Sequence, residues 1–172
     1  MCLAILTNYS NGCRDNQGGV LKFYVTEWEN IDQATYAEAS GVVTTINLNV
    51  GKKFWQYEQE LNTANYTEVQ TPNRQNGTNF VDQTFNASFL KRSAANSYML
   101  RALAEKNLAI ITVDQTGTMF LLGRKNGLSL DPSTSTSGTA MGDGSKYDVI
   151  FKGQEPTLAP TISTAQLADL IV

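Results

Sequence analysis

The strongest constraint on the fold is a two-residue alternation of apolar and polar side chains between short turn signals. It is clearest in segment 80–90, where Val81, Phe85, Ala87 and Phe89 fall on one side of an extended chain. Because successive side chains of a β-strand point to opposite faces, such a segment buries one face and leaves the other in water. Similar segments recur along the chain, and 172 residues suit one domain. The sequence therefore predicts a mainly β protein, with residues 1–172 as a single domain.

Turn signals divide the chain into the segments expected to form strands. Segment 11–19 is rich in glycine and asparagine and closes an N-terminal arm, 1–19, while Asn76-Gly77 is the strongest hairpin signal. The predicted strands are 20–28, 41–48, 53–60, 66–71, 80–90, 108–113, 118–122 and 147–151. A sandwich or a barrel is the natural way to bury strands of this kind.

One main helix is predicted over residues 94–106. Ser93 is a suitable N-cap, Lys106 suits the C-terminal end of the helix dipole, and Asn107 can end the helix. The apolar residues at helical spacing are Ala95, Tyr98, Met99, Ala102 and Leu103. We expect this stripe to cover a sheet.

Two C-terminal segments are expected to act in assembly. Residues 131–145 are rich in Ser, Thr and Gly, so we predict a loop that is mobile in the isolated subunit and becomes ordered on assembly. The tail, 156–172, ends in an apolar run that we expect to be exposed or docked on a neighbouring subunit.

Composition excludes most catalytic and nucleic-acid-binding functions. The chain has no histidine and only two cysteines, Cys2 and Cys13, which we expect to be free thiols; histidine-dependent catalysis and the usual zinc sites are thereby excluded. Net charge is −3 and no basic run exceeds a dipeptide, whereas tight nucleic-acid binding needs several phosphate-neutralising cations. We predict no enzyme activity and no cofactor or metal. With no membrane span or signal peptide in view, we expect synthesis in the cytoplasm.

Three weaker candidates for chemistry remain beside the structural interpretation. Asp143, Ser145 and Asp148 could ligate calcium, although an EF-hand loop would need more acids. Glu58, Glu60 and Asp82 could supply a pair of catalytic carboxylates for glycoside hydrolysis, although solvated acids on strand faces are far commoner. Core packing is favoured over stacking on a base or a sugar for the aromatic residues Trp55, Tyr57 and Tyr66.

A set of short motifs resembles structural proteins of tailed phages that infect Bacteroidetes, including the crAss-like group. The motifs span most of the chain, but each is a turn or a strand edge. They are Cys13–Val20, Asn76-Gly77-Thr78, Asp114–Gly123, Asn126-Gly127-Leu128, Gly138–Asp143, and the closing pattern of Tyr147, Phe151, Gly153, Glu155 and Pro156.

This resemblance implies a tail-tube-like protein or a ring protein of the neck or tail, located in the virion and made in the host bacterial cytoplasm. The implied fold is a sandwich or barrel with a flanking helix and a long β-hairpin, which we place at residues 41–71. The expected channel-lining residues are Gln56, Glu58, Glu60 and Glu68. The expected intersubunit residues are Met141, Asp143, Leu167, Leu170 and Ile171.

The partners implied by the resemblance are further copies, in a six- or twelve-fold ring, and other portal, neck or tail proteins. DNA would pass through during ejection without specific binding, since like charge keeps phosphates from adhering to an acidic channel. The alternative function is a receptor- or carbohydrate-binding module of the tail or capsid. An aromatic cleft with converging polar side chains would favour that alternative.

Overall fold

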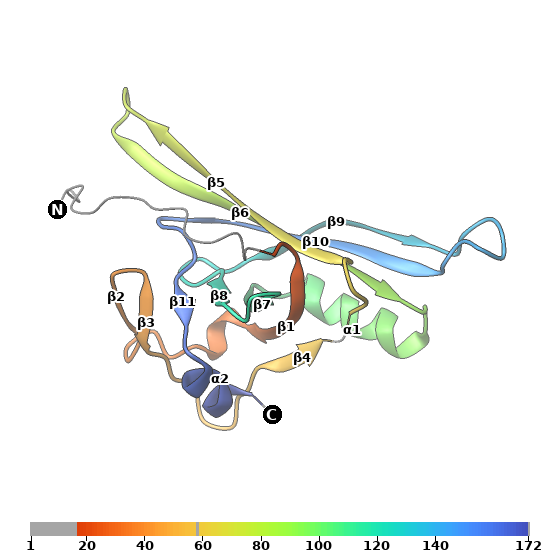
Figure 1. Cartoon of the computed structure of the whole chain (residues 1–172), viewed down its shortest axis with the longest axis horizontal. Helices are drawn as coiled ribbons and strands as arrows, with labels where there is room; N and C mark the ends of the chain where they lie inside the picture. Colours follow the sequence, from red (N-terminus) through yellow and green to blue (C-terminus); the bar gives the residue numbers. More distant parts are fainter. Residues whose placement is uncertain (1–16, 58, 172) are drawn as a thin grey trace.

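The predicted alternation produces two β-sheets that pack face to face (Figure 1). A computed structural model of the chain describes residues 17–57 and 59–171, and it confirms a mainly β fold with one main helix. The predicted N-terminal arm, apart from residues 17–19, lies outside the described residues, as do Cys2 and Cys13. Two facing sheets make the fold a sandwich.

The larger sheet has seven strands in the order β2-β3-β11-β8-β7-β1-β4. Their bounds are β1 Val20–Glu27, β2 Ala37–Ala39, β3 Val42–Thr45, β4 Trp55–Tyr57, β7 Leu108–Asp114, β8 Met119–Leu122 and β11 Thr161–Ile162. The smaller sheet has the order β5-β6-β10-β9 and is antiparallel throughout. Its strands are β5 Ala64–Asn73, β6 Thr78–Leu90, β9 Ser129–Thr136 and β10 Lys146–Glu155. A 3-10 turn, η1 (Trp28–Asn30), and two helices, α1 (Ala94–Ala104) and α2 (Thr164–Leu170), complete the chain.

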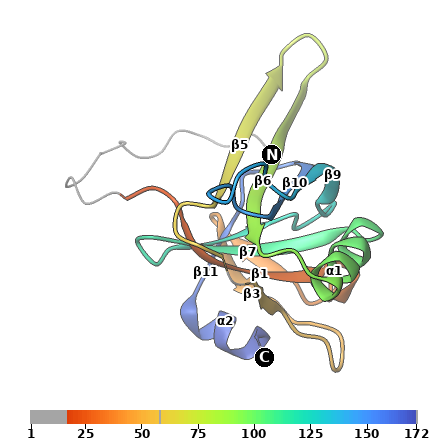
Figure 2. The ribbon, with the colours of Figure 1, turned by 90° about the vertical axis from the view of Figure 1, so that its right-hand side faces the viewer.

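Two hydrophobic cores lie on opposite faces of the seven-stranded sheet. The first fills the space between the sheets, where the Phe85 ring meets Phe23 edge-on at 4.9 Å and stacks on Phe151 at 6.4 Å. The second lies under the other face and is covered by α2 (Figure 2). Burial of each large apolar side chain contributes about 1.5–3 kcal/mol, so both cores stabilise the larger sheet.

The main helix begins at the predicted residue, but the face that it packs against the core differs from the predicted apolar stripe. Ser93 is the N-cap, and its hydroxyl accepts a hydrogen bond from Asn96 N at 3.1 Å. The helix ends at Ala104. Leu103 is buried and Leu100 packs against the first core, whereas Tyr98 is 76% exposed. The predicted stripe is therefore wrong for Tyr98, and also for the exposed Ala95 and Ala102, because the first core meets α1 along the row that contains Leu100 and Leu103.

Residues 41–71 do not form one β-hairpin, so that prediction is wrong. β3 pairs with β2 and β11, β4 pairs with β1, and β5 pairs with β6. The segment crosses from the seven-stranded sheet to the four-stranded one between β4 and β5. Alternation shows which side chains of a strand share a face, but it does not determine which other strand that strand pairs with.

The long hairpin of this fold is β5–β6, closed by the turn at 74–77 and projecting beyond the rest of the sandwich (Figures 1 and 2). Its turn contains the predicted Asn-Gly signal, and Gly77 adopts φ +65°, a conformation that glycine reaches without strain. Ten consecutive residue pairs, from Ala64–Ala87 to Asn73–Thr78, set its register.

The predicted loop 131–145 is a strand in its first part. β9 covers Ser129–Thr136 and pairs with β10, and only the segment after Thr136 forms a turn. Threonine favours strands, and the neighbouring β10 supplies a ladder that local composition does not reveal. Pro132 lies on this edge strand next to a register shift, a position where proline removes no needed ladder bond.

The C-terminal tail packs on its own subunit. Ser163 and Gln166 form a capping box that starts α2, and Leu167 and Leu170 are only 6% and 4% exposed in the second core. Ile171 packs against the same core. The predicted intersubunit role of Leu167 and Leu170 is therefore wrong, because a short amphipathic helix buries them within the chain.

Candidate functional site

The four-stranded sheet carries a mainly polar face on the side away from the first core. Its inward rows include Val81, Phe85 and Val149, all buried, so the alternate residues face outward. The side chains on the paired rows of this outer face are Asn65, Thr67, Val69, Thr71, Phe80, Asp82, Thr84, Asn86, Ser88, Leu90, Ser129, Asp131, Thr134, Thr136, Lys146, Asp148, Ile150, Lys152 and Gln154. Most of them are amides and hydroxyls, and the apolar members are Val69 and Ile150 in the middle of the sheet and Phe80 and Leu90 toward the two ends of β6.

The charged groups on this outer face neutralise one another. Lys146 lies 3.0 Å from a carboxylate oxygen of Asp148, and Lys152 lies 2.6 Å from one of Asp131. Asp82 accepts a hydrogen bond from Gln154 at 2.9 Å. Three carboxylates and two ammonium groups leave a small negative charge, and both cations among these rows are paired. Such a face offers little to hold a polyanion.

Asp148 is the most strongly tied of these acids. Its carboxylate accepts a hydrogen bond from the Ser88 hydroxyl across the β6–β10 ladder and pairs with Lys146. The Ser88 bond, followed by the Lys146 bond and charge, lowers the pKa of Asp148 below its usual range. The carboxylate therefore stays ionised and anchored on this face.

Both edges of the four-stranded sheet are open within the described part of the chain. β5 pairs only with β6, and β9 pairs only with β10. Ser88 N donates to Thr63 O at 3.0 Å, so bonded pairs on the β5–β6 ladder fall at odd-numbered β5 residues. The backbone groups of Tyr66, Glu68 and Gln70 consequently point away from β6, toward the open edge.

The predicted channel-lining residues do not share a face. Gln56 is exposed on β4, in the other sheet, and Glu60 is exposed in the connection to β5. Glu58 lies outside the described residues. Glu68 points inward, where its carboxylate accepts hydrogen bonds from Gln83 Nε2 and Ala159 N, both at 2.8 Å. Because the segment spans two sheets, its spacing did not predict a common surface.

Two of the predicted intersubunit residues, Met141 and Asp143, lie at the tip of the β9–β10 hairpin. Met141 is fully exposed there. The Asp143 carboxylate accepts hydrogen bonds from Thr139 N at 3.0 Å and Ala140 N at 2.9 Å, and these bonds lower its pKa. Gly138 has φ +73°, and a Cβ there would lie 2.6 Å from Asp143 Cβ. The turn is thus shaped locally and presents Met141 to solvent.

A groove lies between the edge strand β4 and helix α1, and we call it the Trp55 groove. It consists of two cavities of about 470 and 480 Å³ that share Trp55 and Tyr57. The first is completed by Gln56, Phe89, Leu90, Asn96 and Met99. The second is completed by Val25, Thr26, Glu27, Asn30, Gly51, Lys52, Lys53, Leu103 and Leu108.

Trp55 lies at the surface and not in the core where it was predicted. Its side chain is 60% exposed, so the core assignment is wrong for Trp55. It is confirmed for Tyr57, which stacks on Phe23 with 5.7 Å between ring centroids, and for Tyr66, which packs against the first core. Trp55 is exposed because it lies at the edge of the sheet. Its strand, β4, pairs with β1 alone among the named strands, where Trp55 is opposite Val25.

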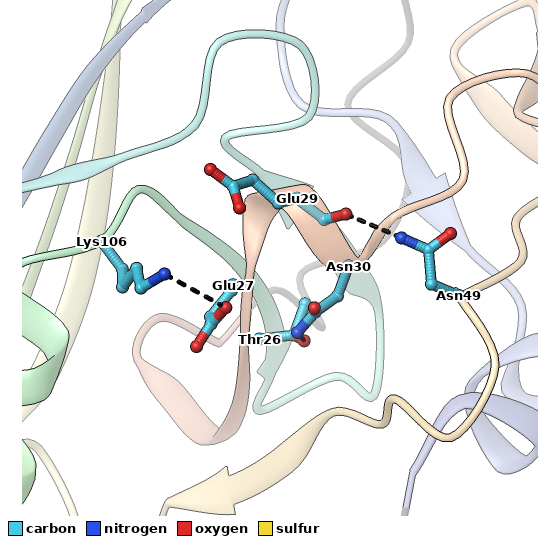
Figure 3. Close-up of polar contacts among 6 residues, drawn as sticks. All are labelled: Thr26, Glu27, Glu29, Asn30, Asn49 and Lys106. Atoms are coloured by element: carbon cyan, nitrogen blue, oxygen red, sulfur yellow. Dashed lines mark hydrogen bonds and ion pairs between the residues drawn. The ribbon is translucent and has the colours of Figure 1, made fainter.

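Hydrogen bonds and an ion pair join the polar residues near η1, at one end of the groove (Figure 3). Asn30 Nδ2 donates to Thr26 Oγ1 at 3.1 Å, and Asn49 Nδ2 donates to Glu29 O at 2.9 Å. Lys106 Nζ lies 3.8 Å from a Glu27 carboxylate oxygen, and both side chains are nearly half exposed. The weak ion pair leaves the Glu27 carboxylate accessible at the mouth of the groove.

Glu155 is a buried carboxylate with a structural role. It is 3% exposed and accepts hydrogen bonds from Lys125 N at 3.1 Å and Asn126 N at 2.9 Å. Burial raises its pKa, against the opposing effect of these bonds and of Arg124. Glu155 fixes the connection between β8 and β9, and with it the position of the two sheets.

Neither a metal cluster nor a membrane-spanning helix is present in the residues that the structure describes. Within 17–57 and 59–171, no group of three or more Cys, Asp or Glu side chains could hold a metal ion. The calcium candidates Asp143 and Asp148 are engaged with different partners, namely the 139–140 backbone and the pair Ser88 and Lys146. In those described ranges no helix has the length and apolar character needed to span a membrane.

Comparison of the chain with protein-family models, curated proteins and solved structures finds no match.

Proposed function

We propose that this chain is a virion structural protein of a tailed phage, which assembles into a ring or tube segment in the neck or tail around the DNA channel. The observation that carries the proposal is the four-stranded sheet, with one polar, charge-compensated outer face and two open edges. The outer face replaces residues 41–71 as the proposed channel lining. The resemblance of the sequence motifs to structural proteins of crAss-like phages supports the same function.

Strand direction makes the open edges suitable for ring closure. Successive strands of the sheet are antiparallel, so β5 and β9 run in opposite directions. A rotation that places β9 of one copy beside β5 of the next therefore creates an antiparallel pair and leaves no free edge in the closed ring. Each backbone hydrogen bond gained contributes about 0.5–1.5 kcal/mol. Six- or twelve-fold closure is the stoichiometry we propose, with other portal, neck or tail proteins as axial partners.

The polar face suits a channel through which DNA moves. The ammonium groups of Lys146 and Lys152 are paired with carboxylates, and the remaining groups are mainly amides and hydroxyls. DNA carries a dense negative charge, so a lining without free cations lets phosphates pass without being held. We propose no catalytic activity and no specific DNA binding for the chain.

Oligomer mass, measured with an edge-blocking variant, tests this function. The wild-type protein should form closed rings by native mass spectrometry, and Gln70→Pro should shift the population to monomers, because Gln70 N–H points toward the open edge. Pro72 already occupies the same edge register, which indicates that β5 tolerates proline there. The matched control is Val69→Pro, which removes a β5–β6 bond and should lower stability instead.

A wild-type protein that stays monomeric both in isolation and when released from virions would overturn the proposal. Rings that survive Gln70→Pro unchanged would show that the edges of the four-stranded sheet do not join the subunits.

A further inference from the structure

We propose that the Trp55 groove binds an extended oligosaccharide. This inference goes beyond the proposed ring function, because the groove lies on the β4 and α1 side of the sandwich and not on the outer face of the four-stranded sheet (Figure 1). A ring that encloses DNA with that outer face would leave the groove accessible at its periphery.

The exposed indole of Trp55 supplies the apolar contact. Its strand is held to β1 by the pairs Val25–Trp55 and Phe23–Tyr57, so the ring is carried on a fixed strand. Tyr57, two residues further along the same strand, is anchored on Phe23. A rigid aromatic ring at the surface offers a large apolar area with little conformational entropy to lose, and the C–H face of a pyranose ring is an apolar surface of matching shape.

Hydrogen-bonding groups flank this ring on both sides. Gln56 and Asn96 line the first cavity, and Glu27 and Asn30 line the second. The bond from Asn30 to Thr26 holds the amide in place (Figure 3). A few fixed polar groups beside an apolar surface set the orientation of a bound ligand, and sugar hydroxyls can both donate and accept.

The charges at the mouth of the groove favour a sugar over an apolar protein segment. Glu27 and Lys106 are nearly half exposed and 3.8 Å apart, so a covering protein would have to dehydrate both groups for a weak contact. A sugar hydroxyl can donate to the Glu27 carboxylate while water remains on the other side. Lys52 and Lys53 also line this end, and the Lys53 ammonium donates to Asp169 O at 2.9 Å, which leaves the Glu27 carboxylate as the acceptor there for sugar hydroxyls.

The size of the groove indicates a ligand of several sugar units. Each cavity, at about 470 or 480 Å³, lies within the usual range for a small-ligand site. Because Trp55 and Tyr57 line both, an oligomer that stacks on Trp55 reaches polar groups on either side. Affinity should therefore increase with chain length until both cavities are filled.

Calorimetric titration of the full chain tests this inference. The probes are β-1,4-linked N-acetylglucosamine and α-1,4-linked glucose oligomers of two to six units. At least one series should bind with affinity that rises with length, and Trp55→Ala should weaken binding at least about tenfold. Tyr98→Ala removes another exposed aromatic ring, on α1 but outside the groove, and should leave binding unchanged.

Three results would overturn it. One is no heat of binding from either series at about 10 mM sugar, where even weak sites are occupied. Another is equal affinity in wild type and Trp55→Ala. The third is a tryptophan emission that shifts on dilution without sugar and loses that shift in Trp55→Phe, since another copy of the chain would then cover the groove. Circular dichroism of each variant verifies folding, and none of these results decides whether the chain forms rings.

Discussion

The two sheets of this protein differ in how many of their faces are buried. In the seven-stranded sheet, β7 is buried along six consecutive residues, Leu108–Val113, because cores lie on both of its faces. In the four-stranded sheet, β6 alternates between buried and partly exposed side chains over Val81–Phe89, because only one face meets a core. A sheet covered on both faces serves as a scaffold, whereas a sheet with one free face and two free edges can meet a partner.

The largest effect should come from the contact that joins the sheets. Phe85→Ala removes a ring packed against Phe23 and Phe151 and should lower the free energy of unfolding by about 3–5 kcal/mol. Thr84→Ala, one residue away on the outer face, should change it by no more than about 0.5 kcal/mol. Urea denaturation followed by circular dichroism measures both. Equal losses would contradict the one-sided burial of β6.

The next largest effect concerns the second core, which α2 of the C-terminal tail covers. Leu167→Ala should cost about 2–4 kcal/mol, because Leu167 is buried in the second core. Asp169→Ala, on the exposed side of the same helix, should be nearly neutral. If the tail instead docks on a neighbour, Leu167→Ala would reduce oligomer mass while leaving the unfolding of the monomer unchanged.

The smallest effect concerns the pH dependence of the link between the sheets. Burial raises the pKa of Glu155 in the folded state above its ordinary value of 4.5, so the folded protein binds this proton more tightly than the unfolded chain. Its contribution to stability is therefore fully present below pH 4.5 and is lost as the pH rises through the folded pKa. Glu155→Gln should remove that loss.

The measurement for Glu155 is the free energy of unfolding from about pH 4 to pH 7, compared with Glu155→Gln. Asp148 provides the opposite case on the outer face: its pKa is lowered, so its contribution is present above the ordinary value and is lost on acidification. A pH profile in which Asp148→Asn and Glu155→Gln act in the same direction would contradict the opposite pKa shifts of the two carboxylates.

Local pattern predicted much of the secondary structure. The strand around Phe85, the hairpin turn at Asn76-Gly77 and the Ser93 cap of α1 all follow from short-range chemistry that acts within a few residues. Composition likewise excluded histidine chemistry, which no fold can restore. The face of α1 was harder to predict, since Tyr98 and Leu103 both fit an apolar stripe and only the position of the neighbouring sheet selects between them.

The local pattern did not predict which strands pair with one another. Residues 41–71 alternate as one hairpin would, yet β4 and β5 belong to different sheets, because a strand partner is chosen by long-range burial. The same cause turned Glu68 inward toward Gln83 and Ala159 and placed Trp55 on an edge.

The amino-acid sequence by itself determined that this chain is mainly β, with one main helix, a weakly acidic and amide-rich surface and no histidine. Only the tertiary structure decided which face and which edges remain free. Alternation is a property of one strand, whereas a polar outer face, an open edge or a groove exists only once strands distant in the chain have paired and the rest of the apolar surface has been buried.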